Sequence, residues 1–222
     1  MPRISRIYTE EGVFHILTRG NNRQTAFHDE KDYNSYLSLL KKYKQQHKFK
    51  LYHYCLMPNH VHLIIEATNN TKLSKLMKQV NLGYLYHYRK RYGYFGHFWQ
   101  DRYKSLLISK DEYLITCGRY IELNPVKAKM VKTPKDYNYS SYNAYAYGKK
   151  DDIIDLNPIY LEWGETEKER QINYRKDIVE ELKRISLNLN ARFIGSEEFI
   201  SQMEEKFNVS NIRSGRGRPI KL

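Results

Sequence analysis

Four stretches of the chain have the short, β-rich pattern that is typical of strands. They are residues 13–19, 49–57, 60–67 and 103–109. Only the dipeptide Pro58-Asn59 separates the second stretch from the third, so these two are predicted to pair as an antiparallel hairpin.

Between and after these strands, apolar residues recur at the spacing of a helix. Residues 32–47 and residues 71–93 both carry leucine and tyrosine on one side, and these two ranges are predicted to be helices. A third helix is predicted from Asp111, its N-cap, toward Asn124, where Pro125 disturbs it.

The order of these elements, β-α-β-β-α-β followed by a further helix, is that of a ferredoxin-like split βαβ fold. The predicted class is α+β, with an antiparallel sheet, helices packed on one face and the other face open. Past residue 150 the composition shifts to a charged helix at 164–187, a second helix at 195–207 and a basic tail. We therefore predict one domain of residues 1–150 and a helical, basic C-terminal extension of residues 151–222.

The charge of the chain points to a polyanionic partner. The 222 residues contain 38 Lys and Arg against 25 Asp and Glu, a formal net charge of +13, and nucleic acid is the leading candidate for the partner. No run of 18 apolar residues occurs and no apolar segment follows the basic N-terminus, so we expect no membrane partner and a cytoplasmic protein. Cys55 and Cys117, the only cysteines, are expected to be reduced and packed.

Tyrosine is unusually frequent, with 21 copies against 8 Phe and 2 Trp. In residues 84–94, "YLYHYRKRYGY", tyrosines alternate with basic residues, a pattern that suits stacking on the bases of single-stranded nucleic acid. The alternative is that these tyrosines fill half-buried positions and the basic residues cover a solvated face.

Two histidines stand two residues apart in the third predicted strand. Side chains alternate along a strand, so His60 and His62 share one face while Val61 points to the other. Two neutral imidazoles on a stiff strand are preoriented for one divalent cation, and the incomplete ligand set leaves positions for substrate oxygen and water. Taken alone, however, a His-x-His pattern often occurs by chance.

The third predicted helix supplies two further candidates. Tyr120 and Asn124 lie four residues apart, hence one turn apart on the same helix face. The amide oxygen of Asn124 is a candidate third metal ligand, with Tyr120 beside a metal-bound phosphate. In the alternative, Tyr120 packs in the core and Asn124 only caps the helix before Pro125.

Four segments in order carry a resemblance to a known family: "YCLMPNHVHLII", "GHFWQDRYKS", "DEYLITCGRYIELNPVKA" and "DYNYSSYNAY". They resemble the single-tyrosine transposases of the HUH nuclease superfamily, in particular the REP-associated tyrosine transposases. The resemblance covers roughly residues 10–150, and residues 194–207 with "GRGRP" also resemble the carboxy-terminal extension of some members.

This resemblance implies an enzyme that cleaves DNA and transfers strands. His60 and His62 match the family's His-hydrophobe-His motif, Tyr120 its nucleophile, and Asn124 a position where relatives place a polar metal ligand. The implied cofactor is Mg²⁺ or Mn²⁺. The tyrosine hydroxyl attacks a phosphodiester, forms a 5′-phosphotyrosine and releases a 3′-hydroxyl, which allows rejoining without ATP. Tyr113 is the weaker choice because Cys117, four residues later, is a poor ligand for a hard ion.

The implied partner is single-stranded or hairpin DNA, since relatives act on palindromic hairpins flanked by guide sequences. Candidate DNA contacts are Arg102, whose alternative role is an ion pair, and also Trp99, Gln100, Arg19, Arg89 and Arg91. The tail resembles a minor-groove hook, and the alternative is a disordered basic tail.

Three points stay open at this stage. The protein is expected as a monomer or as a homodimer that exchanges the tyrosine helix, and as nucleoid-associated in a prokaryote. One rival function is a noncatalytic nucleic-acid-binding module, because the same element order carries many RNA binders. A second rival keeps the chemistry and makes the protein an HUH replication initiator or relaxase.

Overall fold

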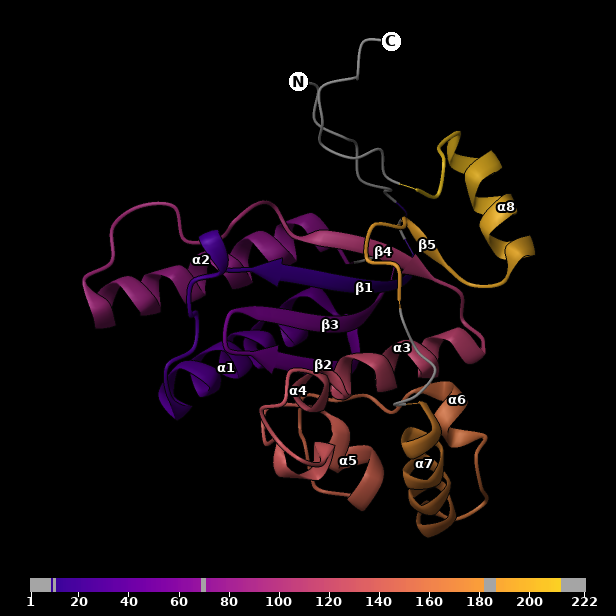
Figure 1. The fold of residues 1–222 in the computed structure, drawn as a ribbon. Helices are drawn as coiled ribbons and strands as arrows, with labels where there is room; N and C mark the ends of the chain where they lie inside the picture. The colour runs from indigo at the N-terminus through magenta and orange to yellow at the C-terminus, as the bar shows by residue number, and fades with distance from the viewer. Residues whose placement is uncertain (1–8, 10, 69–70, 182–186, 213–222) are drawn as a thin grey trace.

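The computed structural model describes residues 9, 11–68, 71–181 and 187–212 (Figure 1). At its centre is a five-stranded sheet in the order β2-β3-β1-β4-β5. The strands are β1 (Gly12–Arg19), β2 (Lys50–Met57), β3 (His60–Ala67), β4 (Lys104–Ile108) and β5 (Phe193–Ile194). The first four pair antiparallel in the order of a split βαβ fold, while β5 pairs in parallel with β4.

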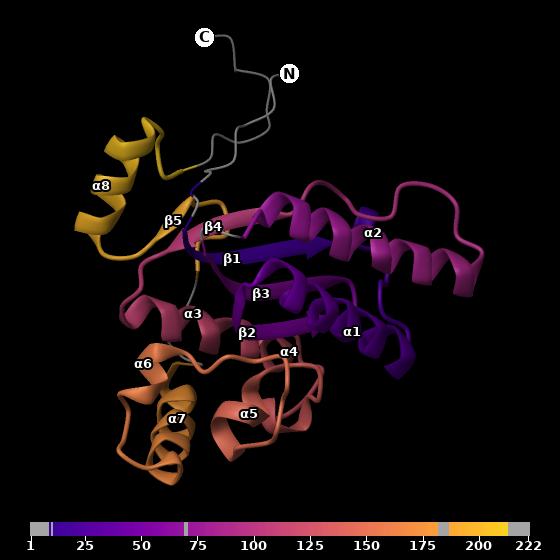
Figure 2. The same ribbon diagram turned by 180° about the vertical axis from the view of Figure 1, so that it is seen from behind.

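One face of the sheet is covered by α1 (Glu30–His47) and α2 (Leu73–Tyr92), which lie side by side in Figure 2. The Asp29 carboxylate caps α1 at its start, and Gly93 adopts the left-handed conformation that ends α2. The largest buried cluster lies between these helices and the sheet; among its members are Phe14, Ile16, Tyr36, Leu40, Val61, Leu63, Ile65, Val80 and Tyr84. The alternation predicted along β3 therefore places its aliphatic residues on the helix side.

The opposite face carries α3 (Glu112–Glu122), which packs mainly over β2 (Figure 1). A second buried cluster joins α3 to this face, with Leu114, Cys117 and Ile121 packed among residues that include Cys55 and Ile64. The α+β class and the β-α-β-β-α-β order of elements are as predicted. The structure adds the parallel strand β5, and it adds α3 over the face that the sequence pattern leaves open.

The third helix ends earlier than the spacing of Tyr120 and Asn124 implies. α3 ends at Glu122, and Asn124 is the first residue of a separate short helix, α4 (Asn124–Lys127). The cause is Pro125, which has no N–H to donate back into the preceding turn and whose ring crowds that turn. Tyr120 and Asn124 therefore do not share one continuous helix.

The remaining elements surround α3 and the edges of the sheet. They are the 3₁₀ turns at Asn21–Arg23 and Pro134–Asp136, then α5 (Tyr142–Tyr147), α6 (Pro158–Leu161), α7 (Glu167–Glu181) and α8 (Glu197–Phe207). A third buried cluster packs Ile115 and Leu123 of the α3 region against Tyr145, Tyr160 and Tyr174. Residues on both sides of position 150 thus share a core, and the division of the chain there stays a prediction.

Two further predictions concern the basic tail and the absence of a membrane partner. The tail that carries "GRGRP", within residues 213–222, lies outside the described residues. Within the described part of the chain, every helix is too short or too polar to cross a bilayer.

Candidate active site

Strand pairing brings three histidines together on the face that carries α3. His62 pairs across the sheet with Leu17, two residues beyond His15 on β1, and His60 pairs with Arg19. The ring centroids of His60 and His62 are 5.0 Å apart at an interplanar angle of 79°, and those of His15 and His62 are 5.0 Å apart at 23°. We call His15, His60 and His62 the histidine triplet.

The inner nitrogens of His60 and His62 are already engaged. Nδ1 of His60 lies 2.5 Å from Oδ1 of Asn59, which can only accept, so this Nδ1 carries the proton and Nε2 keeps a lone pair. Nδ1 of His62 lies 2.8 Å from Nε2 of His15. Neither outer Nε2 atom, of His60 or of His62, makes a hydrogen bond within the described residues.

Burial keeps the triplet uncharged near neutral pH. It lowers the pKa of His15 to about 4 and, helped by the positive charge of Arg19, lowers the pKa of His60 to about 4 as well. The pKa of His62 is lowered well below its ordinary value, first by burial and then by its imidazole neighbours and Arg19. Neutral imidazole is the form that binds metal ions.

The donor set suits an open metal site rather than a closed one. Within the described residues, no group of three or more His, Cys, Asp and Glu side chains is placed to hold a metal ion. His60 and His62 would thus supply two ligands, and the others would be an amide, substrate or water oxygen. At the start of α4, the Nδ2 atom of Asn124 is buried without a hydrogen-bond partner, so the amide is not committed to a neighbour through that atom. Two neutral imidazoles with unengaged outer nitrogens and one uncommitted amide are compatible with a catalytic divalent ion.

Tyr120 lies on the same face of the sheet as the triplet. It packs, half-buried, against the cluster that contains Cys55 and Met57, and these two residues pair across the β2–β3 hairpin with His62 and His60. Burial, with a smaller contribution from Cys117, raises the pKa of the Tyr120 phenol above its ordinary value. Raising the pKa makes this phenol a weaker nucleophile at neutral pH unless its surroundings assist it.

A positive charge lies next to Tyr120. The Nζ atom of Lys127, in α4, is 4.3 Å from the centroid of the Tyr120 ring. The cation is within the range of a cation–π contact with this ring.

The helix that carries Tyr120 is anchored from both sides. Gly118 faces the His53 ring so closely that a Cβ atom would lie 2.5 Å from it, so only glycine allows α3 to approach β2 here. The fully buried Glu122 carboxylate accepts hydrogen bonds from His53 Nδ1 at 2.9 Å, from the Tyr174 hydroxyl at 2.6 Å and from Ser141. The buried Glu122 carboxylate of α3 thus connects this helix to β2 and to α7.

The predicted DNA contacts fall into two groups. Arg19 is half-exposed beside His60, and Arg89, Gln100 and Arg102 are exposed. Trp99 is 9% exposed and donates its ring N–H to the carbonyl oxygen of Asn81 at 3.0 Å. The Arg91 guanidinium pairs with Asp29 and, at 2.7 Å, with Asp32.

Trp99 and Arg91 thus have structural partners, and the DNA-binding role of each predicted residue stays a prediction. The loop that contains Trp99 and Gln100 is joined to the end of β1. The Gln100 N–H donates to the carbonyl oxygen of Arg19 at 2.8 Å, which brings this loop to the strand end that holds His60.

Comparisons with known proteins identify the family of the chain. Residues 9–124, just over half of the chain, match the family described as "Transposase IS200 like". The chain belongs to this transposase family. It is also 27% identical over 160 residues to a Haemophilus influenzae protein named as a REP-associated tyrosine transposase, covering 64% of this chain and 86% of that protein.

A solved structure has the same fold as this IS200-like transposase. It is described as a REP-associated tyrosine transposase bound to a REP hairpin, with a TM-score of 0.57 and 21% identity. The match covers 70% of this chain and 95% of that one. The resemblance predicted from the four sequence segments is confirmed.

Three residues of this transposase site do not follow from the sequence pattern. His15 contacts His62 from a strand 47 positions away, so only the register of the sheet reveals it. Lys127 reaches Tyr120 because α4 turns after Pro125. Lys104 pairs with Leu17, which on its other side pairs with His62, so the register puts Lys104 on the histidine face. A basic residue starting a strand was the available signal for Lys104.

Proposed function

We propose that this transposase cleaves and rejoins single-stranded DNA at hairpin or palindromic repeats through a 5′-phosphotyrosine on Tyr120. Family membership and the solved relative described as bound to a REP hairpin support DNA processing and a hairpin target. The observation that carries the chemistry is a neutral histidine pair with unengaged outer nitrogens on the same sheet face as Tyr120.

The proposed step exchanges one phosphodiester bond for another. The Tyr120 oxygen forms a bond to phosphorus while the bond from phosphorus to the 3′-oxygen breaks, and the 3′-oxygen leaves as a hydroxyl after taking up a proton. The phenol gives up its own proton to solvent. Because no bond energy is released to water, the 3′-hydroxyl of the same or another strand can reverse the step and join the ends.

His60, His62 and the Asn124 amide oxygen would hold a divalent cation, Mg²⁺ or Mn²⁺. Such an ion polarises the phosphoryl group and offsets negative charge that develops during attack. The role of the protein is to keep both imidazoles neutral and correctly oriented. Burial keeps them neutral, and the hydrogen bonds at their inner nitrogens orient them.

Basic side chains around the pair are proposed to hold the DNA backbone. Arg19 and Lys104 stand on the histidine face by register, and Arg102 is exposed two residues before Lys104. Contacts of this kind position the strand without reading its sequence. Lys127 is proposed to favour the phenolate form of Tyr120.

The test is covalent adduct formation with labelled oligonucleotides taken from the palindromes that flank the gene, in Mg²⁺ or Mn²⁺. We expect the wild-type protein to form an adduct that survives denaturing electrophoresis. Tyr120→Phe should bind the same DNA but form no adduct. Tyr113→Phe is the matched control, because it removes a half-buried hydroxyl from the same helix and should still form the adduct.

Each outcome separates the proposal from its rivals. An adduct on Tyr120→Phe would refute the assignment of the nucleophile. Binding without any wild-type adduct would favour a noncatalytic DNA-binding module. Cleavage that is confined to an adjacent replication origin or transfer locus would favour a replication initiator or relaxase.

A further inference from the structure

His15 is the member of the histidine triplet to which the proposed function gives no task. It is fully buried on β1, its Nε2 atom lies 2.8 Å from Nδ1 of His62, and its own Nδ1 has no hydrogen-bond partner. His15 is not placed as a metal ligand, since one of its nitrogens faces His62 and the other is buried. Its only polar contact within the described residues is therefore with His62.

A hydrogen bond between two neutral imidazoles has two proton arrangements. When His15 donates from Nε2, Nδ1 of His62 is the acceptor, and the single proton of the His62 ring sits on its outer Nε2. When His62 donates from Nδ1, its Nε2 keeps a lone pair. Only the second arrangement lets His62 bind a cation.

We infer that His15 is a positioning residue, which accepts the His62 Nδ1 proton and so presents the His62 Nε2 lone pair to a metal ion. The inference rests on the proposed metal site. A His62 that binds metal through Nε2 must carry its proton on Nδ1, and among the described residues this buried nitrogen has only Nε2 of His15 within hydrogen-bond distance. Without that acceptor, metal binding would leave the buried N–H of the ligand itself unpaired; with it, the His62 N–H is paired and the unpaired buried N–H is moved to Nδ1 of His15.

The pairing of His60 with Asn59 gives the same arrangement by a different side chain. Oδ1 of Asn59 can only accept, so Nδ1 of His60 donates and its Nε2 is held ready. His15 would do for His62 what Asn59 does for His60. The two ligands then present equivalent nitrogens on one face of β3.

The first test measures Zn²⁺ binding to DNA-free protein by calorimetry. Zinc is chosen because it suits imidazole ligands and, being diamagnetic, also allows the NMR measurement described below. The signal of interest is the binding that His60→Ala loses. His15→Leu, which fills the space without an acceptor, should weaken this binding by about 10- to 100-fold, as other changes behind metal ligands do. His15→Gln, whose amide oxygen can accept near the same point, should restore most of it. His97→Leu, the same change at an exposed histidine, should have no effect.

The second test needs no variant. Long-range ¹H–¹⁵N spectra of the Zn²⁺-loaded wild-type protein should find the His62 proton on Nδ1 and the His15 proton on Nδ1. A proton on Nε2 of His15 would overturn the inference, and so would Zn²⁺ affinity unchanged in a folded His15→Leu. If wild type and His60→Ala bind Zn²⁺ alike, the metal site of the proposed function fails together with this inference. The adduct on Tyr120 would still be tested independently.

Discussion

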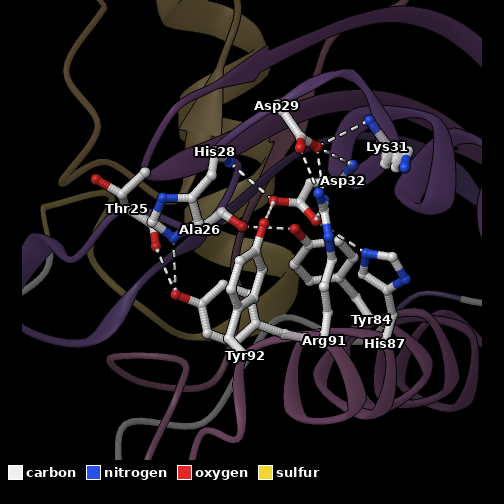
Figure 3. Close-up of polar contacts among 11 residues, drawn as sticks. Thr25, Ala26, His28, Asp29, Lys31, Asp32, Tyr84, His87, Arg91 and Tyr92 are labelled. Atoms are coloured by element: carbon white, nitrogen blue, oxygen red, sulfur yellow. Dashed lines mark hydrogen bonds and ion pairs between the residues drawn. The ribbon is translucent and has the colours of Figure 1, made fainter.

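Two histidine-containing clusters of this protein differ in one respect that decides what each can do. Within the described residues, no hydrogen bond or ion pair joins the histidine triplet to an Asp or Glu side chain. The second cluster, which we call the Asp32 network, joins Asp32 to His28, His87, Arg91 and Tyr92 at the start of α1 and the end of α2 (Figure 3).

Each oxygen of the Asp32 carboxylate accepts two hydrogen bonds. The buried Asp32 carboxylate accepts hydrogen bonds from the backbone N–H of His28 and from His87 Nε2 at 2.9 Å each, from the Tyr92 hydroxyl at 2.8 Å and from Arg91 at 2.7 Å. Burial alone would raise the pKa of Asp32, but these hydrogen bonds outweigh burial and lower it. The Asp32 carboxylate is fully paired and joins two helices, whereas Nε2 of His60, Nε2 of His62 and Nδ1 of His15 make no hydrogen bond within the described part of the chain. A saturated cluster serves stability, and an unsaturated one is available to a ligand.

The largest effect that this comparison predicts is on cleavage. His60→Ala should reduce metal-dependent cleavage by about a thousandfold, because a metal ion supplies several kcal/mol of charge stabilisation and each 1.4 kcal/mol is tenfold. The half-exposed site should keep the free energy of unfolding within about 1 kcal/mol of wild type. Single-turnover cleavage with and without EDTA measures the first effect, and urea unfolding measures the second.

His87→Ala is the control from the Asp32 network, and it should cleave within about twofold of wild type when folded, since His87 lies on α2, which covers the sheet face opposite to the histidine triplet. Equal losses in both variants would remove the distinction between the clusters. Cleavage by wild type that is insensitive to EDTA would remove the metal from the proposal.

Removing the carboxylate of the Asp32 network should change the stability of the protein and not its cleavage activity. Asp32→Ala should lower the free energy of unfolding by about 3 kcal/mol, because it removes a buried carboxylate and leaves part-buried donors of His28, His87 and Tyr92 without their acceptor. The folded fraction should cleave DNA as wild type does. Urea unfolding at pH 7 checks the first point, with Asp152→Ala as the control, an exposed carboxylate whose loss should leave the unfolding midpoint unchanged. An unchanged midpoint for Asp32→Ala would contradict the structural role.

Sequence periodicity was sufficient for the elements that local pattern determines. The β2–β3 hairpin, α1 and α2 appear where alternation and helical spacing predict them, and Asp111 caps α3 as expected. The two-residue strand β5 has no pattern of its own, because its place depends on pairing with β4. The end of α3 was misjudged because the effect of Pro125 reaches back one turn.

In the candidate site, too, some features follow from local sequence pattern and others only from tertiary packing. A two-residue spacing on one strand reveals that His60 and His62 share a face. The hydrogen-bond partners of the histidines come from distant parts of the sequence: Asp32 and His87 are 55 positions apart, and His15 and His62 are 47 positions apart. The sequence therefore names candidate ligands, and only the packing shows which histidines have carboxylate partners.

A third, smaller effect is the response of stability to acid. A carboxyl group whose pKa is lowered in the folded state adds stability above its unfolded pKa of about 3.9, and this is lost as pH falls through the folded-state value. The stability difference between wild type and Asp32→Ala should therefore be constant from pH 8 to about pH 5 and shrink below about pH 4. Unfolding by urea at each pH gives the curve. A difference that grows on acidification would show that Asp32 is not held as the carboxylate.

The smallest predicted effect concerns the charge beside the nucleophile. Lys127→Gln should slow adduct formation two- to fivefold at pH 7, the equivalent of about 0.5–1 kcal/mol for a cation next to an aromatic ring. In the proposed step the Tyr120 phenolate attacks, and the pKa of Tyr120 is raised, so the adduct rate should rise with pH in wild type and the variant should need a higher pH for the same rate. Lys129→Gln removes an exposed positive charge two residues later and should follow the wild-type profile. Coincident profiles for Lys127→Gln and wild type would assign the approach of Lys127 to packing of α4 against α3, without a part in activating Tyr120.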